Sequence, residues 1–306
     1  MLKFLYRIIC GFFLGISTLA PGISGSIVAI IVGIYHDLLE IFSNPFKDIK
    51  KSILIMVPVG IGVGISIVFF VLIFRTLFEI HEKAAYLLFA ALIAGNLPII
   101  ISEIRKYEFK IYYCIFAVGA FAITYVLGWL AFAGGQTLSA GAVTAGIPLV
   151  ALSGLAAGAA LLVPGMSFSM ILILTGIYGQ LMYAAEMVLR LSTDYLLWIG
   201  VFVITVIVGL ALVSKLIKAA FTKFPGPANA AVLGFMLGSF TILVVEGVRI
   251  NDPNFAVWHG IAAVILGLGI SAAFIVLLRF INKDKAQETS KGKQRTKKKT
   301  KGKRKK

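Results

Sequence analysis

Apolar runs separated by short polar segments make up almost the whole chain. A helix that crosses a membrane needs about 20 apolar residues, and runs of about this length occupy residues 52–74, 84–101, 111–133, 195–213 and 255–278. Two more apolar stretches, at about 4–42 and 148–187, are each interrupted by a Pro-Gly pair. The pattern predicts an all-α protein that crosses the membrane several times.

The two interrupted stretches are copies of one sequence. Residues 11–39 and 154–182 lie 143 positions apart and are identical at twelve of 29 positions, including the Pro-Gly pair and a later Gly-Ile-Tyr. We expect each copy to fold as a helical hairpin; in the first, the arms 4–20 and 23–42 are predicted as helices about 25 to 30 Å long. Such a hairpin returns to its starting side, whether it re-enters partway or crosses twice.

Three further spans, at about 52–77, 84–104 and 110–132, separate the hairpins. Because three is odd and a hairpin adds an even number of crossings, the second half is expected to be inverted. Paired, broken hydrophobic segments in two halves are typical of the binding site of a secondary transporter. We predict two inverted-topology repeats, each a Pro-Gly-broken re-entrant hairpin plus three transmembrane helices, at residues 1–132 and 148–280, with an outward linker at 133–147.

The distribution of Lys and Arg predicts the orientation. Before the C-terminal tail, the side that carries the N terminus holds eleven such residues: Lys3, Arg7, Lys47, Lys50, Lys51, Arg105, Lys106, Lys110, Lys215, Lys218 and Lys223. The opposite side holds Arg75, Lys83, Arg190 and Arg249. Since cytoplasmic loops carry the excess of positive charge, we predict a multi-pass protein of the cytoplasmic membrane with both termini in the cytoplasm.

Composition agrees with this class, since 59% of the residues are hydrophobic and 14% are charged. The formal net charge of +16 is concentrated at the C-terminal end, where residues 279–306 hold 14 Lys and Arg against Asp284 and Glu288. We predict that residues 281–306 form a disordered cytoplasmic tail that touches anionic lipid headgroups. Nucleic acid is not an expected partner, because lipid lies much closer to this tail.

Serines follow each Pro-Gly pair and begin the second arm of each hairpin. The first amides of a helix have no acceptor within it, and inside a bilayer they need a polar partner, which an anion can provide. The alternative is a tight turn whose serines merely cap the helix. Two inverted copies can converge on one site, so we predict an anion site built by Pro21, Gly22, Ser24, Gly25, Ser26, Pro164, Gly165, Ser167 and Ser169.

An anion in a dry site needs more than two helix ends and a few hydroxyls. Arg75 and Lys218, 143 positions apart at the ends of long spans, are the candidate cations; snorkelling to the interface is their alternative role. Asp37, Glu103 and Glu246 are candidates for proton coupling, although acidic groups at membrane edges are usually solvated.

Small residues at Gly60, Gly62, Gly64 and Ser66 permit close packing of the helix that carries them. The facing helix can belong to the same subunit or to a second copy. The sequence therefore leaves the oligomeric state open.

At these motifs the chain resembles the bacterial polyprenyl-phosphate transporter family, whose members carry two Pro-Gly-x-Ser-Gly motifs followed by Gly-x-Tyr. The resemblance covers about residues 1–280. Its stretches are GISTLAPGISGSIVAIIVGIYHDLL, VPVGIGVG at 57–64, LIAGNLP at 92–98, LLVPGMSFSMILILTGIYGQL, LVSKLIKAAF at 212–221 and GFMLGS at 234–239.

The resemblance implies the return of undecaprenyl phosphate, the lipid carrier for wall and surface polymers, from the outer to the cytoplasmic leaflet. The phosphate would sit between Ser24/Ser26 and Ser167/Ser169 while the polyprenyl chain stays in lipid. Phe168 departs from the family, which usually has the second glycine of the motif there. We expect the tyrosines of Gly-Ile-Tyr, Tyr35 and Tyr178, to be interfacial aromatics; contact with lipid or an isoprenoid chain is the alternative.

Three other functions compete with lipid transport. An ion-coupled transporter of a small soluble anion would use the same helix-end chemistry. An intramembrane serine protease would use Ser24 as nucleophile and His259 as base, but the predicted topology separates them. A scaffold would not need two broken hairpins. We expect no enzymatic activity and no cofactor, and Cys10 and Cys114 lack the spacing of metal ligands.

Overall fold

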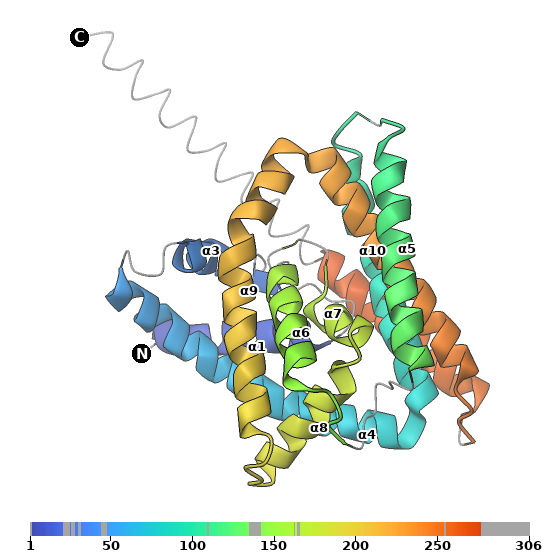
Figure 1. Cartoon of the computed structure of the whole chain (residues 1–306), viewed down its shortest axis with the longest axis horizontal. Helices are drawn as coiled ribbons and strands as arrows, with labels where there is room; N and C mark the ends of the chain where they lie inside the picture. Colours follow the sequence, from blue (N-terminus) through green and yellow to red (C-terminus); the bar gives the residue numbers. More distant parts are fainter. Residues whose placement is uncertain are drawn as a thin grey trace.

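The computed structural model describes residues 2–20, 25, 28–29, 32–43, 48–108, 110–134, 142–161, 163, 166–253 and 255–276. Within these ranges all regular secondary structure is helical. The labelled helices are α1 (Leu2–Leu19), α3 (Tyr35–Ser43), α4 (Ile49–Ile104), α5 (Tyr113–Ala133), α6 (Ile147–Ala160), α7 (Phe168–Leu174), α8 (Tyr178–Leu189), α9 (Leu196–Lys223) and α10 (Pro225–Arg249), and a last helix spans Val257–Val276 (Figure 1). The predicted all-α membrane fold is confirmed.

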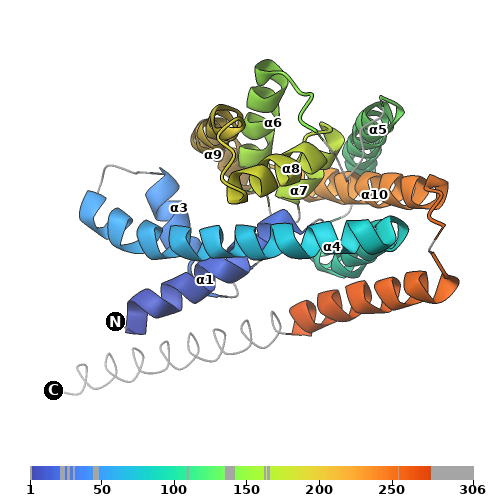
Figure 2. The same cartoon turned by 90° about the horizontal axis from the view of Figure 1, so that it is seen from below.

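Five helices in the described part are long and apolar enough to cross a membrane. They are Ile49–Ile73 and His81–Ile104, both within α4, then α5, α10 and the last helix. The two spans of α4 are joined at His81, whose φ of −150° and ψ of 80° are not helical. In Figure 2 the second span of α4 lies between α10 and the last helix. The predicted spans 52–77, 84–104 and 110–132 correspond to three of these five.

The order of helices repeats along the chain. Five pairs of helices begin at positions that agree with an offset of 143 to within four residues. They are α1 and α6, α3 and α8, the first span of α4 and α9, the second span of α4 and α10, and α5 and the last helix. The duplication seen in the sequence is thus a duplication of helices. The inversion of one half relative to the other, and the boundaries 1–132 and 148–280, stay predictions.

The second arms of the hairpins are broken, so the prediction of one continuous helix at 23–42 was wrong. In the second copy, α7 and α8 meet at an angle of 108°. Gly176 has a φ of +72°, its amide donates to the carbonyl of Ile173, and the Ile177 amide donates to that of Leu172. These bonds are those of a Schellman motif, which ends a helix at a left-handed glycine.

The first copy breaks in the same way. Gly33 has a φ of +76°, and the amide of Ile34 donates to the carbonyl of Ala29 at 3.0 Å. The Gly-Ile of each Gly-Ile-Tyr is therefore a helix stop. The seven residues of α7 extend about 10 Å, a third of the bilayer core of about 30 Å, so α7 alone does not cross the membrane.

Glycines set the close helix contacts within each half. A Cβ at Gly11 of α1 would lie 2.2 Å from the carbonyl oxygen of Val59 in α4. At the equivalent crossing in the second half, a Cβ at Gly158 of α6 would lie 2.2 Å from the carbonyl oxygen of Val206 in α9. The α1–α4 and α6–α9 pairs thus pack backbone against backbone, and α6 and α9 run side by side in Figure 1.

Candidate functional site

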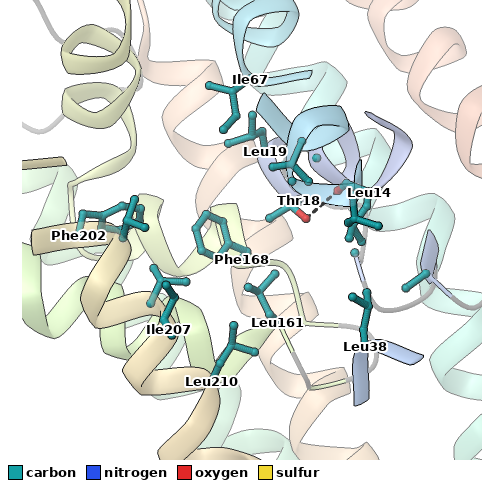
Figure 3. A pocket seen from close by; sticks show the side chains of 18 of the residues that line it. Leu14, Thr18, Leu19, Leu38, Ile67, Leu161, Phe168, Phe202, Ile207 and Leu210 are labelled. Atoms are coloured by element: carbon teal, nitrogen blue, oxygen red, sulfur yellow. Dashed lines mark hydrogen bonds between the residues drawn. The ribbon is translucent and has the colours of Figure 1, made fainter. Parts of the chain in front are cut away.

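A cavity of about 430 Å³ lies between the two halves. Residues of α1, α3 and the first span of α4 form one wall, and residues of α7, α8 and α9, with Leu161, form the other (Figure 3). The described residues that line it are almost entirely apolar. The hydroxyl of Thr18, one of these residues, donates to the carbonyl of Leu14 in its own helix, at 2.7 Å.

The two walls are built from corresponding positions. Sixteen of the lining residues form eight pairs whose members are 143 positions apart: Thr18/Leu161, Gly25/Phe168, Leu38/Leu181, Met56/Ile199, Val59/Phe202, Gly60/Val203, Val63/Val206 and Ile67/Leu210. The cavity therefore lies where matching faces of the repeated units meet. Substrate sites of repeat-built transporters lie at this kind of interface.

Both Pro-Gly motifs reach this cavity. Gly25 of the first motif and Phe168 of the second are equivalent positions, and both line it. A Cβ at Gly25 would lie 2.8 Å from the Thr18 hydroxyl and 3.9 Å from a methyl carbon of Leu161, so this glycine lies between the two halves. The other predicted anion-site residues of these motifs, Pro21, Gly22, Ser24, Ser26, Pro164 and Gly165, lie outside the described residues.

The second motif holds a buried pair of serines. Ser167 and Ser169 are 5% and 0% exposed, and their Oγ atoms are 2.8 Å apart. Ser167 occupies the cap position of α7, but its hydroxyl makes no capping hydrogen bond. Since each hydroxyl has one proton and one donates to the other, one O–H donor of the pair has no acceptor among the described residues and can donate to a ligand. The two serines precede and follow Phe168, which lines the cavity.

The candidate cations lie in helices that line the cavity. Arg75 belongs to α4 and Lys218 to α9, at equivalent positions in the two halves. Their side chains lie outside what the structure describes. A role for them in neutralising an anion stays a prediction.

Two of the candidate coupling residues form ion pairs within their own helix ends. Glu103 pairs with Lys106, three residues on, and Glu246 pairs with Arg249 at 2.8 Å. Asp37 lies in the first turn of α3 and is half-buried. Proton coupling through any of the three stays a prediction.

The counterpart of Asp37 in the second half has a structural role. The Gln180 side chain is 2% exposed, its Oε1 accepts from the amides of Thr144 and Ala145 at 2.8 Å each, and its Nε2 donates to the carbonyl of Gly176 at 3.1 Å. Gln180 thus ties the end of the linker to the break between α7 and α8. The sequence shows only that Gln180 stands where the first copy has Asp37. It does not show that the Gln180 side chain is buried or that its amide makes hydrogen bonds.

Tyr178 joins the two hairpins, and nothing in the sequence pattern predicts this contact. This tyrosine is 1% exposed, and its hydroxyl donates to the carbonyl of Leu19 at 2.9 Å. Leu19 ends α1, where carbonyls have no partner within the helix. The prediction that Tyr178 is an interfacial aromatic was therefore wrong. Tyr35, its counterpart, lines the cavity, which fits the alternative of chain contact.

Tyr178→Phe is expected to destabilise the protein by about 1–3 kcal/mol, because it leaves the buried Leu19 carbonyl without its donor. The midpoint of thermal unfolding in detergent measures this. Tyr125→Phe is the matched control, since Tyr125 lies in α5 and stacks on Phe121. Equal midpoints for the two variants would contradict a stabilising role for the Tyr178 hydroxyl.

The proposed base of a serine protease is held in an aromatic stack. The His259 ring lies 3.8 Å from that of His81 and 3.7 Å from that of Trp258, measured between centroids. Its Nδ1 accepts from the amide of Ala256 at 3.0 Å. His259 is thus engaged with its own helix start and with the break in α4, while Ser24 lies outside the described residues.

A protein-family model described as undecaprenyl phosphate translocase-like matches residues 14–251. The match contains both Pro-Gly motifs and every residue that lines the cavity. No curated protein and no solved structure matches the chain.

Proposed function

Because the chain belongs to the undecaprenyl phosphate translocase-like family, we propose that it moves undecaprenyl phosphate across the cytoplasmic membrane, from the outer to the cytoplasmic leaflet. This direction returns the carrier for cell-envelope synthesis. The observation that carries the proposal is the cavity whose walls are equivalent residues of the two halves, since such a site can face either side of the membrane in turn.

The phosphate is bound by the serines of the two Pro-Gly motifs in this proposal. Ser167 and Ser169 supply a buried hydroxyl pair, one of whose protons has no acceptor among the described residues, and Ser24 and Ser26 supply the equivalent groups of the first motif. Arg75 and Lys218 lower the cost of bringing a charged group into a poorly hydrated region. The C-terminal tail binds anionic lipid headgroups and adds nothing to the transport step.

A soluble anion fits the site less well. Among the described residues that line the cavity, only Thr18 and Tyr35 carry a side-chain oxygen or nitrogen atom, and the Thr18 hydroxyl donates within its own helix. A small anion would have to exchange its hydration shell for methyl and aromatic groups, whereas the apolar part of a lipid gains from the same surroundings. The apolar lining thus favours a lipid substrate.

Purified protein in liposomes, with labelled undecaprenyl phosphate in one leaflet, tests the proposal. We expect the label to reach the other leaflet faster than in empty liposomes. A proton gradient is expected to accelerate the movement if Asp37, Glu103 or Glu246 couples it, and Asn or Gln at the coupling residue then removes the acceleration. Movement no faster than in empty liposomes, with folded protein, would contradict a translocase.

A further inference from the structure

We infer that the cavity between the halves binds the part of the isoprenoid chain next to the phosphate, against the wall formed by α1, α3 and α4, and that Phe168 with Phe202 forms the opposite surface. This inference rests on the proposed function, because it takes a polyprenyl phosphate as the substrate. It adds a site for the chain, which the sequence placed wholly in the bilayer.

The pairs that build the cavity are unequal in size, and the difference has one direction. At four of them the first half carries the smaller residue. These pairs are Thr18 and Leu161, Gly25 and Phe168, Val59 and Phe202, and Gly60 and Val203. The second-half wall is therefore filled and the first-half wall is left open. The free space lies along the first half, and an occupant lies there.

The aromatic pair gives the filled wall its shape. Phe168 and Phe202 are 7% and 5% exposed, and their rings meet edge to face with centroids 6.1 Å apart. An isoprenoid chain is a row of flat, branched, unsaturated units, and ring faces and edges pack closely against such units. A straight acyl chain matches this surface less well, so the wall favours an isoprenoid.

The cavity reaches the lipid-facing surface. Among its lining residues, Val203 and Ile207 of α9 are 47% and 55% exposed, and Gly60 of α4 is also exposed. A chain held at the inner end, near Phe168, can therefore continue outward into the bilayer. The volume of about 430 Å³ is within the range of ordinary ligand pockets, roughly 300–1,000 Å³, so it holds only part of a long chain.

Two glycines of α4 make a matched pair of variants. Gly60 lines the cavity, Gly64 lies one turn further along the same helix outside it, and a Cβ at either meets nothing within 4 Å. Gly60→Leu therefore fills the cavity from its open wall without a clash in the backbone. Gly64→Leu adds the same side chain on the same face of α4, one turn beyond Gly60, at an exposed position that does not line the cavity.

Photolabelling in liposomes by a polyprenyl phosphate with a diazirine in the units next to the phosphate tests the inference without transport. We expect labelling of residues on α1, α4 or α9, and at least about tenfold weaker labelling of Gly60→Leu, which corresponds to 1.4 kcal/mol. Gly64→Leu is expected to label like the unmodified chain. The matching polyprenol is expected to compete, and inorganic phosphate is not.

Three results would overturn the chain site. They are equal labelling of Gly60→Leu and Gly64→Leu, labelling confined to residues outside the cavity, and equal competition by a phosphatidylglycerol, which would make the cavity a general lipid-tail site. Translocation measured on the same proteoliposomes separates the two proposals. Transport with normal labelling of Gly60→Leu removes only the chain site, while cavity labelling without transport removes only the translocase.

Discussion

Replacing Ser24 and Ser167 together with alanine is expected to reduce translocation of undecaprenyl phosphate to the rate of empty liposomes. Each hydroxyl that binds a charged group contributes about 1.5–3 kcal/mol, so losing two slows transport roughly a hundredfold or more at 1.4 kcal/mol per factor of ten. The rate of label transfer between leaflets measures the effect, and the amount of folded protein is determined in parallel.

Ser153→Ala is the matched control for this variant. Ser153 is 0% exposed, like Ser169, but its hydroxyl donates to the carbonyl of Leu149 in its own helix α6. Its loss tests the general effect of removing a buried serine hydroxyl. Full activity of the Ser24/Ser167 variant, or an equal loss in Ser153→Ala, would remove the serines from the phosphate site.

Gly62→Ala is expected to lower the stability of the protein by about 1–3 kcal/mol, the usual cost of overpacking. A Cβ at Gly62 would lie 2.0 Å from the carbonyl oxygen of Ile8 and 2.7 Å from the amide nitrogen of Phe12. Both contacts are backbone atoms of α1, which no side-chain rotation can move. The α1–α4 crossing must therefore open, and this shows as a lower unfolding temperature in detergent.

Gly64→Ala, two residues along α4, provides the comparison. Nothing lies within 4 Å of a Cβ there, and replacing a helical glycine by alanine is favourable by about 0.8–1.0 kcal/mol. We expect this variant to unfold at the same temperature as the unmodified chain or slightly above it. If the two variants lost stability equally, the close approach of α1 and α4 at Gly62 would be wrong.

The glycines of α4 separate what the sequence shows from what helix packing decides. Gly60, Gly62, Gly64 and Ser66 were predicted to allow close packing, with the partner left open. In the structure Gly62 and Ser66 face α1, where a Cβ at Gly15 would overlap the Ser66 hydroxyl, while Gly60 and Gly64 face away. Small size is visible in the sequence, but the direction of each residue depends on how the helix is rotated against its neighbour.

The break at each Gly-Ile-Tyr is marked in the sequence only by its glycine. The continuous apolar run at 23–42 favoured one helix, because hydrophobicity sets whether a segment enters the membrane and says little about its hydrogen bonds. A glycine in an apolar run costs a helix only about 1 kcal/mol. The left-handed φ at Gly176 allows both Schellman hydrogen bonds, and the left-handed φ at Gly33 allows the bond from the Ile34 amide to the Ala29 carbonyl. These bonds end the helix in each copy.

The sequence by itself determined the class of the protein, its main spans and its duplication. These depend on local properties, since the length of an apolar run fixes whether a helix can cross the bilayer and an identity at a constant offset needs no structure to be seen. It also identified the Pro-Gly motifs, because a broken helix in lipid needs a polar partner.

Only the tertiary structure decided which residues meet. Three of its contacts join segments far apart in the chain. Gly25 and Phe168 line one cavity, Tyr178 binds the end of α1, and Gln180 binds the linker. Successive residues of a helix point to all sides of it, and the sequence does not mark which side meets another helix. Packing decides which side is buried. The cavity exists because two equivalent faces meet and one of them carries smaller residues, which is a property of the assembled pair and of neither half alone.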